Sequence, residues 1–157
     1  PAVRFAVVGD GPALAWLRRE LQGTSTVFTG FLAGAELASA YASADVFAFP
    51  SDSETLGFAA LEAMAAGVAL VGVRAGGVPH IVSHERDGLL VPPGDVPAFV
   101  RAVRRLLDDA SLRQRLAVAG RAEAERWSWD ASTRALVRYY QAARRMRRAV
   151  AHRGNGT

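Results

Sequence analysis

The stretch SDSETLGFAALEAMAAG, residues 51–67, places two glutamates, Glu54 and Glu62, in an otherwise apolar, alanine-rich run. It follows the apolar run Val46–Phe49 and enters a predicted helix at about Gly57. In a doubly wound α/β fold, ligands bind at the loops that leave the carboxyl ends of parallel strands. The sequence therefore predicts a ligand site here, provided that the rest of the chain forms such a fold.

Short apolar runs alternate with helical patterns along the chain, which predicts an open parallel sheet with helices on its faces. Each run is almost wholly apolar, as is typical of strands that are buried on both faces. The fold class expected is therefore α/β and Rossmann-like. The strand-like runs are Val3–Val8, Thr26–Thr29, Val46–Phe49, Ala69–Val73 and Leu89–Val91.

Helical patterns fill the intervals between these runs. They cover about Ala13–Leu21, Gly34–Tyr41 and Gly57–Ala66, with a brief turn at Pro79–Val82. Gly23 and Gly67 are expected to end helices, because glycine tolerates positive φ. After the last strand we expect three helices: Asp95 caps one that runs to about Leu107, Ser111 starts the second and Asp130 starts the third.

The composition excludes several classes of protein. The 157 residues are 50% hydrophobic and 22% charged, as in an ordinary globular domain, and they include no cysteine. Disulfides and thiolate metal sites are therefore excluded. No apolar run reaches the roughly 18 residues that cross a bilayer. All nineteen basic residues are arginine, and they gather toward the end of the chain, where they form either a solvated helix face or a surface for anions.

The residue types in the opening stretch favour a sugar nucleotide. Backbone amides of residues 55–58 stand at a predicted helix N-terminus, where the macrodipole favours an anion such as phosphate. Carboxylates accept hydrogen bonds, so Glu54 and Glu62 suit sugar and ribose hydroxyls. Two plainer interpretations stay open. In the first, Glu62 only pairs with Arg74 or contacts solvent. In the second, Glu54 is only an acid placed near the helix start by the helix dipole.

An ordered series of motifs resembles one enzyme family. It runs from VVGDGP (7–12) through VFTGFL (27–32), LASAYASADVFAFPS (37–51), RAGGVPHIV (74–82) and DGLLVPPGD (87–95), and includes PSDSETLGFAALEAMAAG (50–67). Together these resemble the retaining GT-B glycosyltransferases of family 4, whose glutamate pair has this spacing. Within the family, SDSETLG with RAGGVP is most similar to the sulfoquinovosyltransferases that make the plastid sulfolipid.

The resemblance implies a domain organisation. Residues 1–150 correspond to the donor-binding domain, the C-terminal half of a GT-B fold, without its first strand and without the N-terminal acceptor domain. Residues 151–157 are expected to be a frayed tail. The family's Gly-Arg-Leu segment and lysine, which hold the donor diphosphate, are absent here. We therefore expect an enzyme domain that is poorly active or inactive alone, or alternatively a non-catalytic nucleotide-sugar-binding or partner-completing module.

The resemblance also implies roles for individual residues. Glu54 matches the glutamate that holds the transferred sugar, and Glu62 matches the one that holds the ribose. The donor-sugar set is Glu54, Thr55, Leu56, Gly57 and Phe58, and the nucleotide set is Glu62, Phe31, Leu32, Gly9 and Gly11. Gly9 and Gly11 are equally well explained as turn residues. We assign no catalytic residue and no metal.

His80 and His84 are candidates for acid–base chemistry, but we interpret them as surface histidines. We expect no cofactor, a UDP-sugar as co-substrate, and a lipid or small-molecule acceptor. Nucleic acid is not expected, because no aromatic platform accompanies the charge. An anionic membrane surface is a further expected partner, through Arg144, Arg145, Arg147 and Arg148. The localisation expected is a chloroplast membrane if the sulfolipid resemblance holds, and otherwise the cytoplasm.

Overall fold

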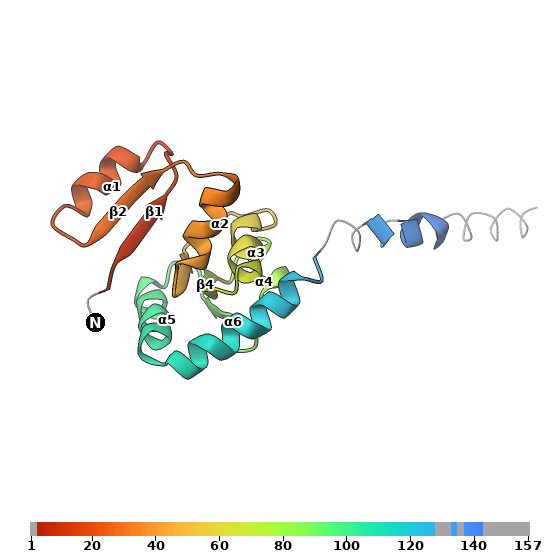
Figure 1. Ribbon diagram of the computed structural model, residues 1–157. Helices are drawn as coiled ribbons and strands as arrows, with labels where there is room; N and C mark the ends of the chain where they lie inside the picture. Colours follow the sequence, from red (N-terminus) through yellow and green to blue (C-terminus); the bar gives the residue numbers. More distant parts are fainter. Residues whose placement is uncertain (1–2, 128–132, 135–136, 143–157) are drawn as a thin grey trace, which may run out of the picture. The chain divides into compact units, whose positions relative to one another are not determined.

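The computed structural model describes residues 3–127, 133–134 and 137–142, and the chain divides into two compact units (Figure 1). The first unit is Pro1–Ala44 and the second is Asp45–Thr157. Both alternate parallel strands with helices, so the predicted α/β class is confirmed. The strands form two sheets, one in each unit, where the sequence predicted one.

The first unit is a strand–helix–strand arrangement followed by a second helix. Its elements are β1 (Phe5–Val8), α1 (Leu14–Glu20), β2 (Thr26–Gly30) and α2 (Gly34–Ala42). β1 and β2 pair in parallel, with Phe5 beside Thr26, and the register shifts between Val7 and Val8. The prediction that these strands are buried on both faces is wrong: most of β1 is exposed, and β2 alternates between exposed and half-buried residues. In a sheet of two strands, each strand has only one neighbour.

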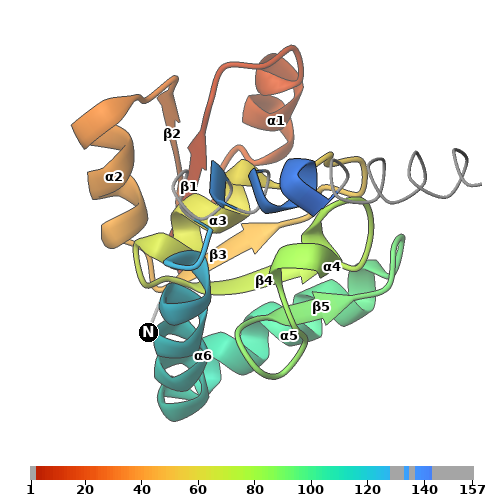
Figure 2. The same ribbon diagram turned by 90° about the vertical axis from the view of Figure 1, so that its right-hand side faces the viewer.

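The second unit contains a three-stranded parallel sheet in the order β3–β4–β5. Its elements are β3 (Val46–Phe49), α3 (Phe58–Ala65), β4 (Ala69–Val73), α4 (Val78–Ile81), β5 (Leu89–Val91), α5 (Val96–Asp108) and α6 (Ala110–Ala124). Figure 2 shows α3 over one face of the sheet and α5 along the other. Every residue of β4 and β5 is buried, which confirms the expected burial for these two strands. The same expectation is wrong for β3, an edge strand with three half-buried residues and one exposed residue.

Alternation along β4 divides the core into two clusters, one on each face of the sheet. Leu70 packs with residues of α3 and α4, including Ala60, Met64 and Val78. Its neighbours Ala69 and Val71 pack on the other side with α5 and α6, through Leu106, Leu112 and Leu116. Successive strand residues point to opposite faces, so a wholly apolar strand such as β4 supplies both clusters. The sheet therefore holds α3 firmly by its buried face.

The helix ends lie within one or two residues of the predicted positions, with one correction. Asp95 caps α5, as predicted, and accepts a hydrogen bond from the Ala98 amide at 2.8 Å. The next helix is capped by Asp109, whose carboxylate accepts from the Leu112 amide at 2.8 Å, and the prediction that Ser111 starts it is wrong. Both residues are good caps by type, and the aspartate bonds the amide three residues on. Asp130 lies outside the described residues.

Candidate functional site

The connection between β3 and α3 carries the residues that the sequence singled out. α3 begins after Gly57, which has left-handed backbone angles (φ 79°, ψ 49°) and is buried. A Cβ at this position would make ordinary contacts with Ile81 and Val78 of α4, at 3.4 Å and 3.5 Å. Glycine is therefore needed for its positive φ, which turns the chain into the helix. The side chains of α4 lie against this residue where a Cβ would stand, and ligand contact by Gly57 stays a prediction.

The first turn of α3 leaves backbone amides available. The Ala60 amide donates to the Gly57 carbonyl at 3.0 Å. Within the described part of the chain, the amides of Phe58 and Ala59 donate to no group, and no side chain caps the helix. Such amides lie at the positive end of the helix dipole and can bind an anion.

The two glutamates stand on either side of these amides in the sequence, and neither is sealed inside the protein. Glu54 is half-buried in the loop, and Glu62 is exposed on α3. The opposite face of α3 is buried, with Ala63 and Met64 fully inaccessible to solvent. Thr55 and Phe58 are exposed and Leu56 is half-buried. The loop and the first two turns of α3 therefore hold two solvent-accessible carboxylates and two free backbone donors within one continuous stretch of chain.

A glycine pair after β4 supports this loop, and the sequence predictions did not single it out as part of the site. The Gly77 amide donates a hydrogen bond of 2.8 Å to the Glu54 carbonyl. Gly76, with φ 56°, lies directly against the same carbonyl. The signal was present in the sequence, because RAGGVP was among the motifs that carried the family resemblance. Its packing partner, however, lies some twenty residues earlier in the chain.

The other predicted nucleotide residues lie in the first unit, at the carboxyl ends of β1 and β2. The Gly9 amide donates to the Gly30 carbonyl at 2.8 Å, so the loop after β1 lies beside Phe31, which is 72% exposed, and half-buried Leu32. Gly9 has a φ of 124°, so a turn role is established for it. Ligand contact by these residues stays a prediction.

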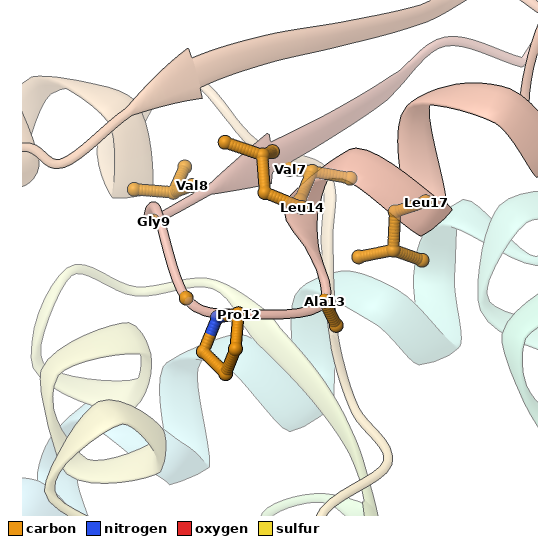
Figure 3. Close-up of a pocket in the computed structure, with 8 residues that line it drawn as sticks. Val7, Val8, Gly9, Pro12, Ala13, Leu14 and Leu17 are labelled. Carbon is orange, nitrogen blue, oxygen red and sulfur yellow. The ribbon is translucent and has the colours of Figure 1, made fainter.

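A small apolar hollow lies at the end of β1. Its volume is about 210 Å³. The turn from Gly9 to Ala13 links β1 to α1 beside it (Figure 3). The lining consists of Val7, Val8, Gly9, Gly11, Pro12, Ala13, Leu14 and Leu17. With no charged side chain in this lining, the hollow suits an apolar or flat group better than a phosphate.

The histidines differ in their surroundings. His80 is exposed on α4. His84 has a structural role, since its Nδ1 accepts a hydrogen bond from the Leu90 amide at 2.9 Å and so ties the loop to β5. The predicted membrane-contact arginines, Arg144, Arg145, Arg147 and Arg148, lie outside the described residues.

The described part of the chain has neither a metal-binding cluster of side chains nor a helix that could span a membrane. It contains no cluster of three or more histidine, aspartate or glutamate side chains able to hold a metal ion. Among the helices described, none combines the length and the apolar character required to cross a membrane.

Known proteins resemble this chain in both sequence and fold. The family described as glycosyl transferases group 1 matches residues 1–109. The sulfoquinovosyl transferase SQD2 of Arabidopsis thaliana is 46% identical over 136 residues, which are 85% of this chain and 27% of that protein. A GDP-mannose-dependent alpha-mannosyltransferase of Mycobacterium tuberculosis is 38% identical over 144 residues, covering 91% of this chain and 37% of that protein.

A solved structure, Anabaena Alr3699/HepE in complex with UDP-glucose, superposes with a TM-score of 0.73 and 26% identity over 80% of this chain and 37% of its own. The chain thus spans well under half the length of each of these relatives. The family match covers most of the chain, and the α/β architecture is that of its GT-B structural neighbours. The chain belongs to the glycosyl transferases group 1 family.

Proposed function

We propose that this chain is the sugar-nucleotide-binding part of a retaining, family 4 glycosyltransferase that transfers a hexose from a UDP-sugar. One arrangement carries the proposal: the free amides of Phe58 and Ala59 at the start of α3, with Glu54 before them and Glu62 after them. The amides suit the donor diphosphate, Glu54 suits hydroxyls of the sugar, and Glu62 suits the ribose.

The chemistry proposed needs no protein nucleophile or general base from this chain. Departure of the nucleoside diphosphate builds negative charge on its phosphate oxygens. Amides at a helix N-terminus stabilise that charge, and the acids hold the sugar in position. This role is electrostatic and orienting, and for that reason we assign no catalytic residue to the described part of the chain.

Sulfoquinovose is the first sugar to test, since one relative is named a sulfoquinovosyl transferase. A lipid acceptor and a chloroplast membrane belong to that version of the proposal. Another hexose, with a cytoplasmic enzyme, is the alternative. A second relative is named as dependent on GDP-mannose, so the nucleotide must be tested as well.

Calorimetric titration of the chain with UDP-glucose, UDP and GDP-mannose tests the proposal. We expect UDP-glucose to bind and Glu62→Ala to weaken it roughly 10- to 100-fold, because hydrogen bonds to a charged group contribute about 1.5–3 kcal/mol. Glu125→Ala is the control, since Glu125 is likewise an exposed acid at a helix of the second unit. Equal affinities for both variants and the unmodified chain would refute the role of Glu62. Stronger binding of GDP-mannose than of UDP-glucose would indicate a GDP-sugar as the donor. Binding of the donor without sugar transfer would favour the non-catalytic module over the enzyme.

A further inference from the structure

We infer that Gly76 and Gly77 are positioning residues of the donor site. Because they have no side chains, they can fix the connection between β3 and α3 that carries Glu54, called the Glu54 loop below. The inference rests on the proposed role of Glu54 in holding the sugar. It adds a part of the protein, the connection between β4 and α4, that has no direct contact with the donor in that proposal.

The contact is between two backbones and leaves no room for a methyl group. A Cβ on Gly77 would stand 2.2 Å from the Thr55 carbonyl oxygen and 2.8 Å from the Leu56 Cα. A Cβ on Gly76 would stand 2.2 Å from the Glu54 carbonyl oxygen. Backbone atoms cannot swing aside as the end of a long side chain can, so any larger residue must move one of the two segments.

The Glu54 loop is the segment that would move. On the other side of the contact, Val78 and Ile81 of α4 belong to the buried core, so the glycine pair is attached to a fixed element. Ser53 and Thr55 are exposed, and Glu54 is half-buried. Displacing a partly exposed loop disturbs less packing than displacing a core helix. The displacement would also break the hydrogen bond from the Gly77 amide to the Glu54 carbonyl.

Gly77 gives the cleaner test of the two glycines. Any residue can adopt its φ of −78°, so the effect of an alanine there would come from the steric clash alone and not from backbone strain. Gly76 has a φ of 56°, and there the effects of strain and contact would be mixed. Gly94→Ala provides the control for a strained backbone without a contact, because Gly94 lies in the same unit, has a φ of 75°, and a Cβ added to it would meet no atom within 4 Å.

The expected effect separates the sugar from the nucleotide. Glu62 and the amides of Phe58 and Ala59 belong to α3, which Ala63 and Met64 anchor in the core, so Gly77→Ala should leave them in place. We expect the affinity for UDP-glucose to fall about tenfold or more, while the affinity for UDP stays within about twofold. A general loss of structure would lower the affinities for UDP-glucose and UDP alike.

Hydrogen exchange without ligand provides a readout that does not depend on the donor. Gly77→Ala should speed exchange of the amide at position 77 by about tenfold, since it loses its acceptor, whereas Gly94→Ala should leave it unchanged. Unchanged exchange in Gly77→Ala would overturn the inference, whatever the ligand results. Equal losses of UDP and UDP-glucose affinity, or none, would overturn it as well.

The unmodified chain gives a second measurement in case Gly77→Ala does not fold. UDP-glucose should slow exchange of the Gly77 amide, and UDP should not, because only the sugar engages Glu54. Equal protection by both ligands, or by neither although both bind, would overturn the inference. Failure of the unmodified chain to bind either ligand would contradict the proposed function, and the ligand-free exchange data would still decide whether Gly77 holds the Glu54 loop.

Discussion

Replacing Asp87 with alanine should destabilise the second unit more than the loss of any exposed acid. Asp87 is only 2% exposed, and it is the one charged side chain that is buried in the described residues. Its Oδ1 accepts a hydrogen bond from the Ser83 amide at 2.6 Å, and its Oδ2 accepts from Arg86 Nε at 3.0 Å. The carboxylate thus closes the loop between α4 and β5.

The magnitude follows from these two partners. Loss of the hydrogen bond that the partly buried Ser83 amide donates to the carboxylate costs about 1.5–3 kcal/mol. The ion pair with Arg86 adds only about 0.2–1 kcal/mol, because the arginine side chain is 64% exposed and keeps a second contact with Glu123. Together they predict a fall of about 2–4 kcal/mol in the free energy of unfolding.

Urea unfolding at neutral pH, followed by far-UV circular dichroism, measures this change. Asp52→Ala is the matched control, because Asp52 is exposed, and it should change stability by less than about 0.5 kcal/mol. Asp87→Asn keeps an acceptor oxygen and should fall between the two. The reasoning is wrong if Asp87→Ala and Asp52→Ala unfold at the same urea concentration with the same dependence on urea.

Two further changes test local features of the second unit. Asp109→Ala removes the cap of α6 and should cost about 1 kcal/mol in the same assay, whereas Ser111→Ala should cost little. Glu85→Gln removes the ion pair with Arg105, whose hydrogen bonds lower the pKa of Glu85 below its ordinary value of 4.5. A lowered pKa in the folded state stabilises the protein above the ordinary value, and this stabilisation is lost as the pH falls. The difference between Glu85→Gln and the unmodified chain should therefore be present at pH 7, stay under about 1 kcal/mol because both groups are half-exposed, and vanish in acid; a constant difference would contradict it.

The sequence predicted the strands of the second unit to the residue and those of the first unit less well. Val46–Phe49, Ala69–Val73 and Leu89–Val91 are continuous apolar runs between turn residues, and the structure has strands with these bounds. Val3–Val8 is apolar apart from Arg4, but its strand begins at Phe5 and is mostly exposed. An apolar run indicates that a segment can be buried, whereas burial depends on neighbours that the run itself does not specify.

The candidate site divides in the same way. The places of Glu54, Gly57 and Glu62 in a loop, at a helix start and on the helix could be predicted, because they lie in one continuous stretch, and their binding of hydroxyls stays a prediction. The role of Gly77 could not be predicted from local sequence, because it depends on a contact with Thr55 across the ends of two strands. Two adjacent glycines after a strand indicate a turn, and only the fold shows what lies against them.

The two glutamates are held by different parts of the fold, and this bears on how donor recognition is divided under the proposed function. Glu62 belongs to a helix whose opposite face lies in the core, so its position is as stable as the second unit itself. Glu54 belongs to a loop that accepts a backbone hydrogen bond from Gly77 and that, under the inference above, the glycine pair holds in place. Substitutions around the glycine pair can therefore alter the hold on the sugar while the nucleotide remains bound. Substitutions that leave a cavity in the core under α3, such as Met64→Ala, should instead lower the affinity for the nucleotide and the free energy of unfolding together. The reason is that α3 and Glu62 would shift as one unit.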